Sequence, residues 1–580
     1  MKKFSLLSAI LLLCLACGGP SGEDAADFVF TNGKVYTVDE SHPWAEAVAV
    51  KGDKIVYVGD DAGASAFVGS ATETTDLNGR MMLPGFVSGH DHLIGSNWTK
   101  AGVNLFAAES KEDYLRMIKE YADANPDAEI LVGYGWEKGK YGGFPTAKEL
   151  DAIVSNRPAV FFDYTIHDLW LNSKALEMAK ITKDTPDPQP GFSYWRRDAA
   201  GNPEGVAIEV SWLQAYIDIG AWKPETMLPE SRKILYQKAA EAGLTAVMNA
   251  GLVTPNLANQ PEAFKDQKAA LELLDELDAK GDLELRTFVY MIYKKATGDV
   301  GELVQGTLEL REQHDSDRVR VAGIKIHPEG NWMTKTSLQV EPFLDGDSGN
   351  VGIPGDKVKE VILAGNAAGL DVITHVDGSA TVRATVDAIE ASRQAGHTDA
   401  RNTLQHYHLV QPDDHARVIA MELPINVTPV FTTDWSNTDA LAINMLGEER
   451  AAAEMNEYPD AVRRGLKVSL SADIPSSPVD MIGPLLSMEA AMTLQSPNDE
   501  GSKTFPPGKQ GLTLEQAIQG VTIFPAWQAR MEDKIGSLEI GKFADLVVLE
   551  KNLFDVDPKD IADVEVVATM MGGRYTYQAE

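Results

Sequence analysis

The chain has 580 residues, of which 44% are hydrophobic and 24% are charged, so it is long and apolar enough to bury a large core. Its formal net charge of −34 argues against nucleic acid as a partner, because phosphate binding needs clustered Lys and Arg. At this length we expect one large domain together with a smaller one.

Residues 1–17 are predicted to be a lipoprotein-type signal peptide. Two early lysines would form the positive n-region, and the apolar run after them is too short for a membrane span. Cys17 would be the lipidated residue, and the polar residues 18–26 a flexible tether. We therefore expect a protein of the bacterial cell envelope, on the periplasmic side or outer surface, whose only membrane contact is this anchor. An ordinary secretory signal with a chance cysteine is the alternative.

Both cysteines, Cys14 and Cys17, lie in this leader. The rest of the chain has none, so it can form neither a disulfide nor a thiolate–metal bond. Any metal must be held by His, Asp, Glu or a modified Lys.

The two ends of the remaining chain share one pattern, short strands separated by glycine turns. In residues 27–83, Asn32–Gly33 and Gly52–Asp53 are turn signals of hairpins. Residues 536–580 return to the same rhythm. We expect both ends to pair into one composite β-sandwich.

Residues 84–535 alternate between short buried-strand candidates and amphipathic helical segments. This alternation predicts an α/β fold with a closed (β/α)8 TIM barrel. The longest interruption, about residues 93–243, contains strands and helices of its own, and we expect an inserted α/β subdomain over the barrel mouth. The predicted strands cover residues 81–90, 244–251, 285–293, 319–327, 369–376, 402–408, 423–430 and 466–473.

Reactive groups of (β/α)8 enzymes lie at the carboxyl ends of the strands. Applied to this sequence, the rule selects a basic and acidic set from five strands: His90, His92, Lys325, His375, His406 and Asp473. Residues two apart on a strand share a face, so His90 and His92 can bind one cation together. Imidazole and carboxylate suit zinc, although manganese, iron or nickel would also fit. As an ammonium, Lys325 would repel a metal; it must be neutral and modified, or serve as an ion-pair partner or Schiff-base former.

Ordered motifs from about residue 27 to 577 resemble the amidohydrolase superfamily, in its YtcJ-like branch (amidohydrolase family 3) related to N-substituted formamide deformylases. The motifs are "LPGFVSGHDHL", "GYGWEKGKYGGFPTAKELDAI", "HDLWLNSKAL", "GIKIHPEG", "THVDGSATV", "LQHYHLV", "SLSADIPSSPVDM" and "KIGSLEIGKFADLVVLEKN". The resemblance implies two divalent ions bridged by a carboxylated Lys325. It implies that His90, His92 and Asp473 bind one metal, and His375 and His406 the other.

The sequence departs from the family pattern at three neighbours of these ligands. Gln405 replaces the usual Glu before the sixth-strand histidine, Glu329–Gly330 the usual Asp-Gly, and Gly378–Ser379 the usual Gly-Asp. Such neighbours set ligand orientation and basicity, so these changes bear on the substrate and the second metal.

Four further residues are candidates for substrate binding. His327 and His408 each stand two residues beyond a predicted ligand and would share its face. His167 matches a substrate-facing position of the family, and Trp136 lies in another of its motifs. Packing, or a place at the rim, is the alternative for each.

The expected reaction is hydrolysis of an amide-like, non-peptide C–N bond of a small molecule. A hydroxide shared by the metals would be the nucleophile, and Asp473 would act as general base and then as general acid. The same site could cleave esters, lactones or phosphoesters. The sequence is also compatible with a lyase that uses Lys325 as a Schiff base, and with a non-catalytic, ligand-binding surface lipoprotein. The oligomeric state is open, and a homodimer is compatible with the sequence.

Overall fold

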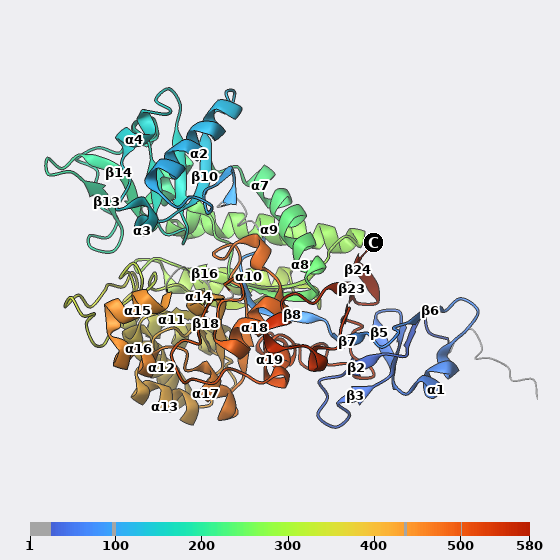
Figure 1. Cartoon of the computed structure of the whole chain (residues 1–580). Coiled ribbons are helices and arrows are strands. Elements are labelled where there is room, and N and C mark those ends of the chain that lie inside the picture. Colours follow the sequence, from blue (N-terminus) through green and yellow to red (C-terminus); the bar gives the residue numbers. More distant parts are fainter. Residues whose placement is uncertain (1–24, 95–99, 434–437, 500, 580) are drawn as a thin grey trace, which may run out of the picture.

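The computed structural model describes residues 25–94, 100–433, 438–499 and 501–579. Figure 1 shows a central barrel with the insert on one side and a β-rich domain on another. The predicted leader, including Cys17, lies outside the described residues. Within them, no helix combines the length and the apolar character needed to cross a membrane.

Eight parallel strands form the central sheet, and each neighbours the next in chain order. Every strand candidate of the barrel is present, and almost every residue of these strands is buried, as expected when both faces of a parallel sheet are covered. The chain therefore has a TIM-barrel α/β fold. The strands are β8 (Phe86–Asp91), β15 (Leu244–Asn249), β16 (Arg286–Tyr293), β17 (Val319–Ile326), β18 (Asp371–Val376), β19 (Thr403–His406), β20 (Ile425–Val427) and β21 (Val468–Leu470).

The first predicted strand, residues 81–90, is two strands in the structure. β7 (Met81–Pro84) pairs with strands of the β-rich domain, and only β8 belongs to the barrel. Gly85 separates them, and a Cβ there would lie 2.3 Å from a Thr245 side-chain atom. Both strands are buried, so the sequence shows one continuous apolar run and does not indicate where the chain passes from one sheet to the other.

The edges of the barrel sheet meet where β8 approaches β21. A Cβ at Gly89 would lie 2.5 Å from Ser469 Oγ, so only glycine allows this approach. The Ile474 amide also donates to Asp91 Oδ1 at 2.6 Å. This junction brings the first and eighth strand ends together.

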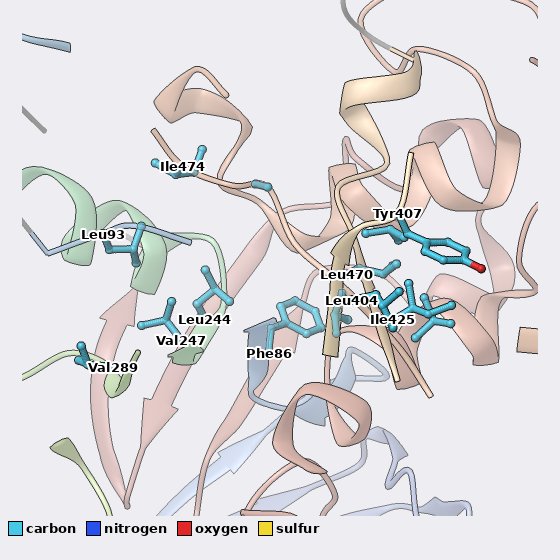
Figure 2. Packing of buried hydrophobic residues seen from close by; sticks show 14 of the residues in the cluster. Phe86, Leu93, Leu244, Val247, Val289, Leu404, Tyr407, Ile425, Leu470 and Ile474 are labelled. Carbon is cyan, nitrogen blue, oxygen red and sulfur yellow. The ribbon is translucent and has the colours of Figure 1, made fainter. Parts of the chain in front are cut away.

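Amphipathic helices cover the outside of the barrel. In α12 (Ser379–Gln394), Val382, Val386 and Ile389 repeat at helical spacing and are at most 1% exposed. Figure 2 shows side chains of several strands, among them Phe86 and Val289, in the same hydrophobic cluster. The helices that follow successive strands include α9 (Gln260–Lys280), α10 (Val300–Gln313), α11 (Gly355–Ala367), α12 (Ser379–Gln394), α13 (Pro412–Ala420), α17 (Tyr458–Arg463), α18 (Pro484–Thr493) and α19 (Leu514–Gly520).

The segment between β8 and β15 contains a six-stranded sheet in the order β13-β14-β12-β11-β10-β9. Helix α2 (Lys111–Ala124) packs on it through Tyr114 and Ile118. Helices α6 (Trp212–Asp218) and α7 (Pro224–Ser231) lead back to the barrel (Figure 1). The strands are β9 (Val103–Asn104), β10 (Leu131–Trp136), β11 (Ala159–Asp163), β12 (Leu169–Leu171), β13 (Tyr194–Arg197) and β14 (Pro203–Ile208).

The β-rich domain combines both ends of the described chain. Its six-stranded sheet, β24-β23-β22-β7-β2-β3, places β22 beside β7, with Val548 opposite Met82. A second sheet, β5-β4-β1-β6, shares a hydrophobic cluster with it, to which Phe30 and Met570 contribute. The strands are β1 (Phe28–Thr31), β2 (Lys34–Tyr36), β3 (Trp44–Ala45), β4 (Ala47–Lys51), β5 (Lys54–Gly59), β6 (Glu73–Asp76), β22 (Leu546–Leu549), β23 (Val566–Met571) and β24 (Arg574–Gln578).

Candidate metal centre

The ends of β8 and β21 place three predicted ligands around one point. Asp473 Oδ1 is 3.3 Å from His90 Nε2 and 3.5 Å from His92 Nε2. One ligand atom from each residue lies within 4.8 Å of the others, and all three side chains are buried. Closure of the barrel creates this cluster, because the residues come from opposite ends of the chain.

The other three predicted ligands adjoin this cluster. Lys325 Nζ, at the end of β17, is 3.3 Å from His90 Nε2. The His406 ring centroid is 4.7 Å from that of His90 and 4.5 Å from that of His375. The structure therefore brings all six residues selected from the sequence to the barrel mouth.

Hydrogen bonds fix the ring orientation of the histidines. His92 Nδ1 donates to the Gly251 carbonyl at 2.8 Å, so its Nε2 keeps the lone pair that faces Asp473. His375 Nε2 donates to the Gly330 carbonyl at 2.9 Å, which leaves Nδ1 as its free ligand atom. Such partners hold the tautomer that a metal ligand needs.

Gln405 supports His90 in the same way, through a hydrogen bond to the ring nitrogen Nδ1. Its Oε1 lies 2.5 Å from His90 Nδ1, while its Nε2 has no hydrogen-bond partner among the described residues. A neutral amide therefore supports this predicted ligand, where the resemblance implies a carboxylate. His90 Nε2 is left facing Asp473 and Lys325.

The protonation states agree with those of metal ligands. Burial lowers the pKa of His92 to about 3 and also lowers the pKa of His90. Burial alone would raise the pKa of Asp473, but His90, His92 and Lys325 hold it below its ordinary value. Neutral imidazoles and an ionised carboxylate are the forms that bind a divalent ion.

Two buried atoms of the cluster test whether a metal fits. Asp473 Oδ1 and His406 Nδ1 have no hydrogen-bond partner in the part of the chain that the structure describes. Buried polar atoms rarely stay unpaired, and a cation would satisfy them. Both residues also have left-handed backbone conformations, with φ of 52° and 72°, which cost energy for residues with a side chain. The donor set therefore fits a divalent metal.

Three of the four predicted substrate-side residues line the same cavity as the ligands. His327 stacks on His375 with centroids 4.4 Å apart. His408 Nδ1 pairs with Asp377 Oδ2 at 2.6 Å, and His167 Nδ1 with Glu209 Oε2 at 2.8 Å.

Trp136 is placed elsewhere. Its indole is 1% exposed, belongs to the core of the insert and donates to the Phe161 carbonyl at 2.9 Å. The prediction that Trp136 contacts substrate therefore needs correction, since this side chain does not line the cavity. A motif position alone did not show which face of β10 would pack inward.

Sequence reasoning missed three charged residues of the cavity region. Lys294 directly follows β16, so the strand-end rule that selected Lys325 could have found it. Asp377 stands two residues beyond His375, so the two-residue spacing that selected His327 and His408 could also have selected it. Glu209 directly follows β14 of the insert, a strand outside the barrel to which the strand-end rule does not apply.

A TIM barrel with a buried His-His-Asp cluster at its strand ends, held ready for a divalent ion, defines a metal-dependent hydrolase. The comparisons agree with this class. Residues 73–577 match the model of the amidohydrolase family, and the chain belongs to that family.

Known relatives are similar over almost their whole length. The putative amidohydrolase YtcJ of Bacillus subtilis is 24% identical over 95% of this chain and 99% of its own. The N-substituted formamide deformylase of Arthrobacter pascens is 23% identical over 95% of this chain and 98% of its own. The crystal structure of an uncharacterized metal-dependent hydrolase from Pyrococcus horikoshii has the same fold, with a TM-score of 0.68, 23% identity, and coverage of 92% of this chain and 99% of that one.

Proposed function

We propose that this protein hydrolyses an amide-like, non-peptide C–N bond of a small molecule. The observation that carries the proposal is the arrangement of His90, His92 and Asp473 around one point in the cavity, where a buried Asp473 oxygen has no hydrogen-bond partner among the described residues. Membership of the amidohydrolase family and similarity to a formamide deformylase support a C–N bond as the target.

We propose two zinc ions as cofactors. His90, His92 and Asp473 would hold one, His375 and His406 the other, and a carboxylated Lys325 would bridge them. Burial lowers the pKa of Lys325 to about 7, which supplies the neutral amine that carboxylation requires. When bound, the metals would polarise the scissile carbonyl and acidify a water molecule.

The chain's own residues supply proton transfer and shielding from solvent. The Asp473 carboxylate, ionised at neutral pH, would take a proton from the attacking water and return it to the leaving nitrogen. Segments of the insert around His167 and Val210 line the same cavity, so substrate would react away from bulk water.

A lipid anchor at Cys17, which would place the enzyme on the periplasmic side or outer surface of the cell envelope, remains a proposal. The motif before Cys17 supports it. Replacement of Cys17 by Ser should release the protein from membranes and abolish its labelling by a fatty acid. Continued labelling of that variant would contradict the proposal.

A substrate panel on metal-quantified enzyme tests the activity. We expect hydrolysis of at least one N-formyl, N-acyl or cyclic amide, its loss with a chelator, and its return with zinc. Exclusive hydrolysis of esters, lactones or phosphoesters would contradict the C–N assignment. Borohydride trapping of substrate on Lys325 would favour a Schiff-base lyase, and absence of both metal and turnover would favour a binding protein.

A further inference from the structure

Lys294 lines the cavity, and its ammonium has no close partner among the described residues. It directly follows β16 and stands two residues beyond Ile292, so both side chains point to the same face and line the cavity. Across residues 25–94, 100–433, 438–499 and 501–579, its ammonium takes part in no hydrogen bond and in no ion pair within 4.0 Å. Burial lowers its pKa, and Glu209 only partly opposes this effect.

The carboxylate that acts electrostatically on Lys294 is Glu209, and it already forms an ion pair with another residue. Glu209 is 2% exposed and pairs with His167 Nδ1 at 2.8 Å. Lys294 also lies close enough to three other basic groups to lower their pKa values. These groups are His167, His327 and Lys325. Glu209 is therefore not available to Lys294 as a close partner, and a half-buried ammonium without such a partner among the described residues is costly.

The same cavity also has an apolar lining. Ile292 of β16 contributes to it, together with side chains from the insert and from the segment after β15: Ile166, Val210, Leu213, Val253 and Leu257. A ligand that fits this lining combines an apolar body with one anionic group, because the body excludes water and leaves the ammonium to pair with the anion.

One predicted metal ligand, Lys325, lies on the neighbouring strand β17. Ile292 of β16 is in register with Lys325 of β17, and the His327 amide donates to the Tyr293 carbonyl at 2.9 Å. One small molecule could therefore contact both the predicted ligands and Lys294.

We propose that Lys294 binds a carboxylate of the substrate, so that the substrates are apolar amides carrying a carboxylate. This inference rests on the proposed amide hydrolysis. Lys294 would determine specificity and would take no part in bond cleavage.

The test compares Lys294→Met with Lys294→Arg, using Lys295→Met as the matched control on an exposed neighbour. The substrates are N-benzoyl derivatives of glycine, β-alanine and 4-aminobutanoate, each paired with its primary carboxamide. For the best chain length we expect kcat/KM to favour the carboxylate by about 10- to 100-fold, the range for a hydrogen bond to a charged group. Lys294→Met should bring this ratio close to one, mainly through KM, while Lys294→Arg keeps part of it and Lys295→Met all of it.

Two outcomes would overturn the inference. The first is a wild-type enzyme that does not prefer the carboxylate at any chain length. The second is a Lys294→Met enzyme that loses activity on both members of a pair by the same factor, as expected if the lysine only balances Glu209.

Calorimetric binding of the same compounds separates this inference from the proposed function. If wild-type enzyme hydrolyses no amide, the proposed function fails. Tighter binding of a carboxylate than of its carboxamide, lost in Lys294→Met, would then still support the subsite. Equal binding of both compounds, or of neither, would contradict it.

Discussion

The two ends of the barrel differ in how completely their buried polar atoms are hydrogen-bonded. At the carboxyl ends of the strands, Asp473 Oδ1, His406 Nδ1 and His408 Nε2 are buried without hydrogen-bond partners among the described residues. At the amino ends, the buried charges are paired: Arg286, the first residue of β16, donates twice to Asp545 at 2.6 and 2.9 Å. Groups kept unpaired are available to metal and substrate, and groups paired within the protein stabilise it.

Asp473→Asn should have the largest effect, because it removes a proton acceptor while keeping the shape of the side chain. We expect kcat to fall by about 10³-fold or more, within the range for loss of a general base and metal ligand. Metal analysis and steady-state kinetics on the same sample would check this. The two histidines should retain much of the metal.

Asp480→Asn is the matched control, since Asp480 is an exposed carboxylate of the same loop. It should leave kcat within about twofold. If Asp473→Asn instead kept near-normal kcat, Asp473 would not be the general base, and its assigned role would be wrong.

Asp545→Asn should affect stability rather than turnover. The Arg286 side chain is fully buried and would lose its only carboxylate among the described partners, leaving an uncompensated charge. We expect a loss of about 3–5 kcal/mol in the free energy of unfolding, read from urea denaturation, with kcat at 25 °C unchanged for the folded fraction.

Glu120→Gln provides the control for this pair, because Glu120 and Arg116 form an exposed ion pair at 3.1 Å. Its effect should stay within about 0.5 kcal/mol. An equally small effect of Asp545→Asn would show that the Arg286–Asp545 contact does not stabilise the amino end of the barrel.

The sequence predicted which residues meet at the barrel mouth better than it predicted their surroundings. Strand ends follow from buried apolar runs, so His90, Lys325 and Asp473 could be selected before any coordinates were known. The Arg286–Asp545 pair could not, because it joins residues 259 positions apart on two domains. Trp136 was misplaced for a related reason, since burial within the insert depends on packing partners that no local spacing reveals.

Arg530→Met should have the smallest effect of the three. Arg530 donates twice to Asp371, the first residue of β18, at 2.6 and 2.8 Å, but its side chain is 44% exposed. Asp371 would also keep a hydrogen bond from the Arg401 amide at 2.8 Å, so it would not be left unpaired. We expect a loss of about 1 kcal/mol, which solvent screening keeps well below that of Asp545→Asn.

The losses in unfolding free energy of Arg530→Met and Asp545→Asn show whether burial determines how much an ion pair at the amino end stabilises the protein. Urea denaturation of Arg530→Met beside Asp545→Asn should give the larger loss for the pair that is fully buried, because water cannot replace the missing partner there. Equal losses would mean that pairing at the amino end acts through surface charge rather than through burial. Turnover should be unaffected in both folded variants, since neither residue lines the cavity that contains the predicted ligands.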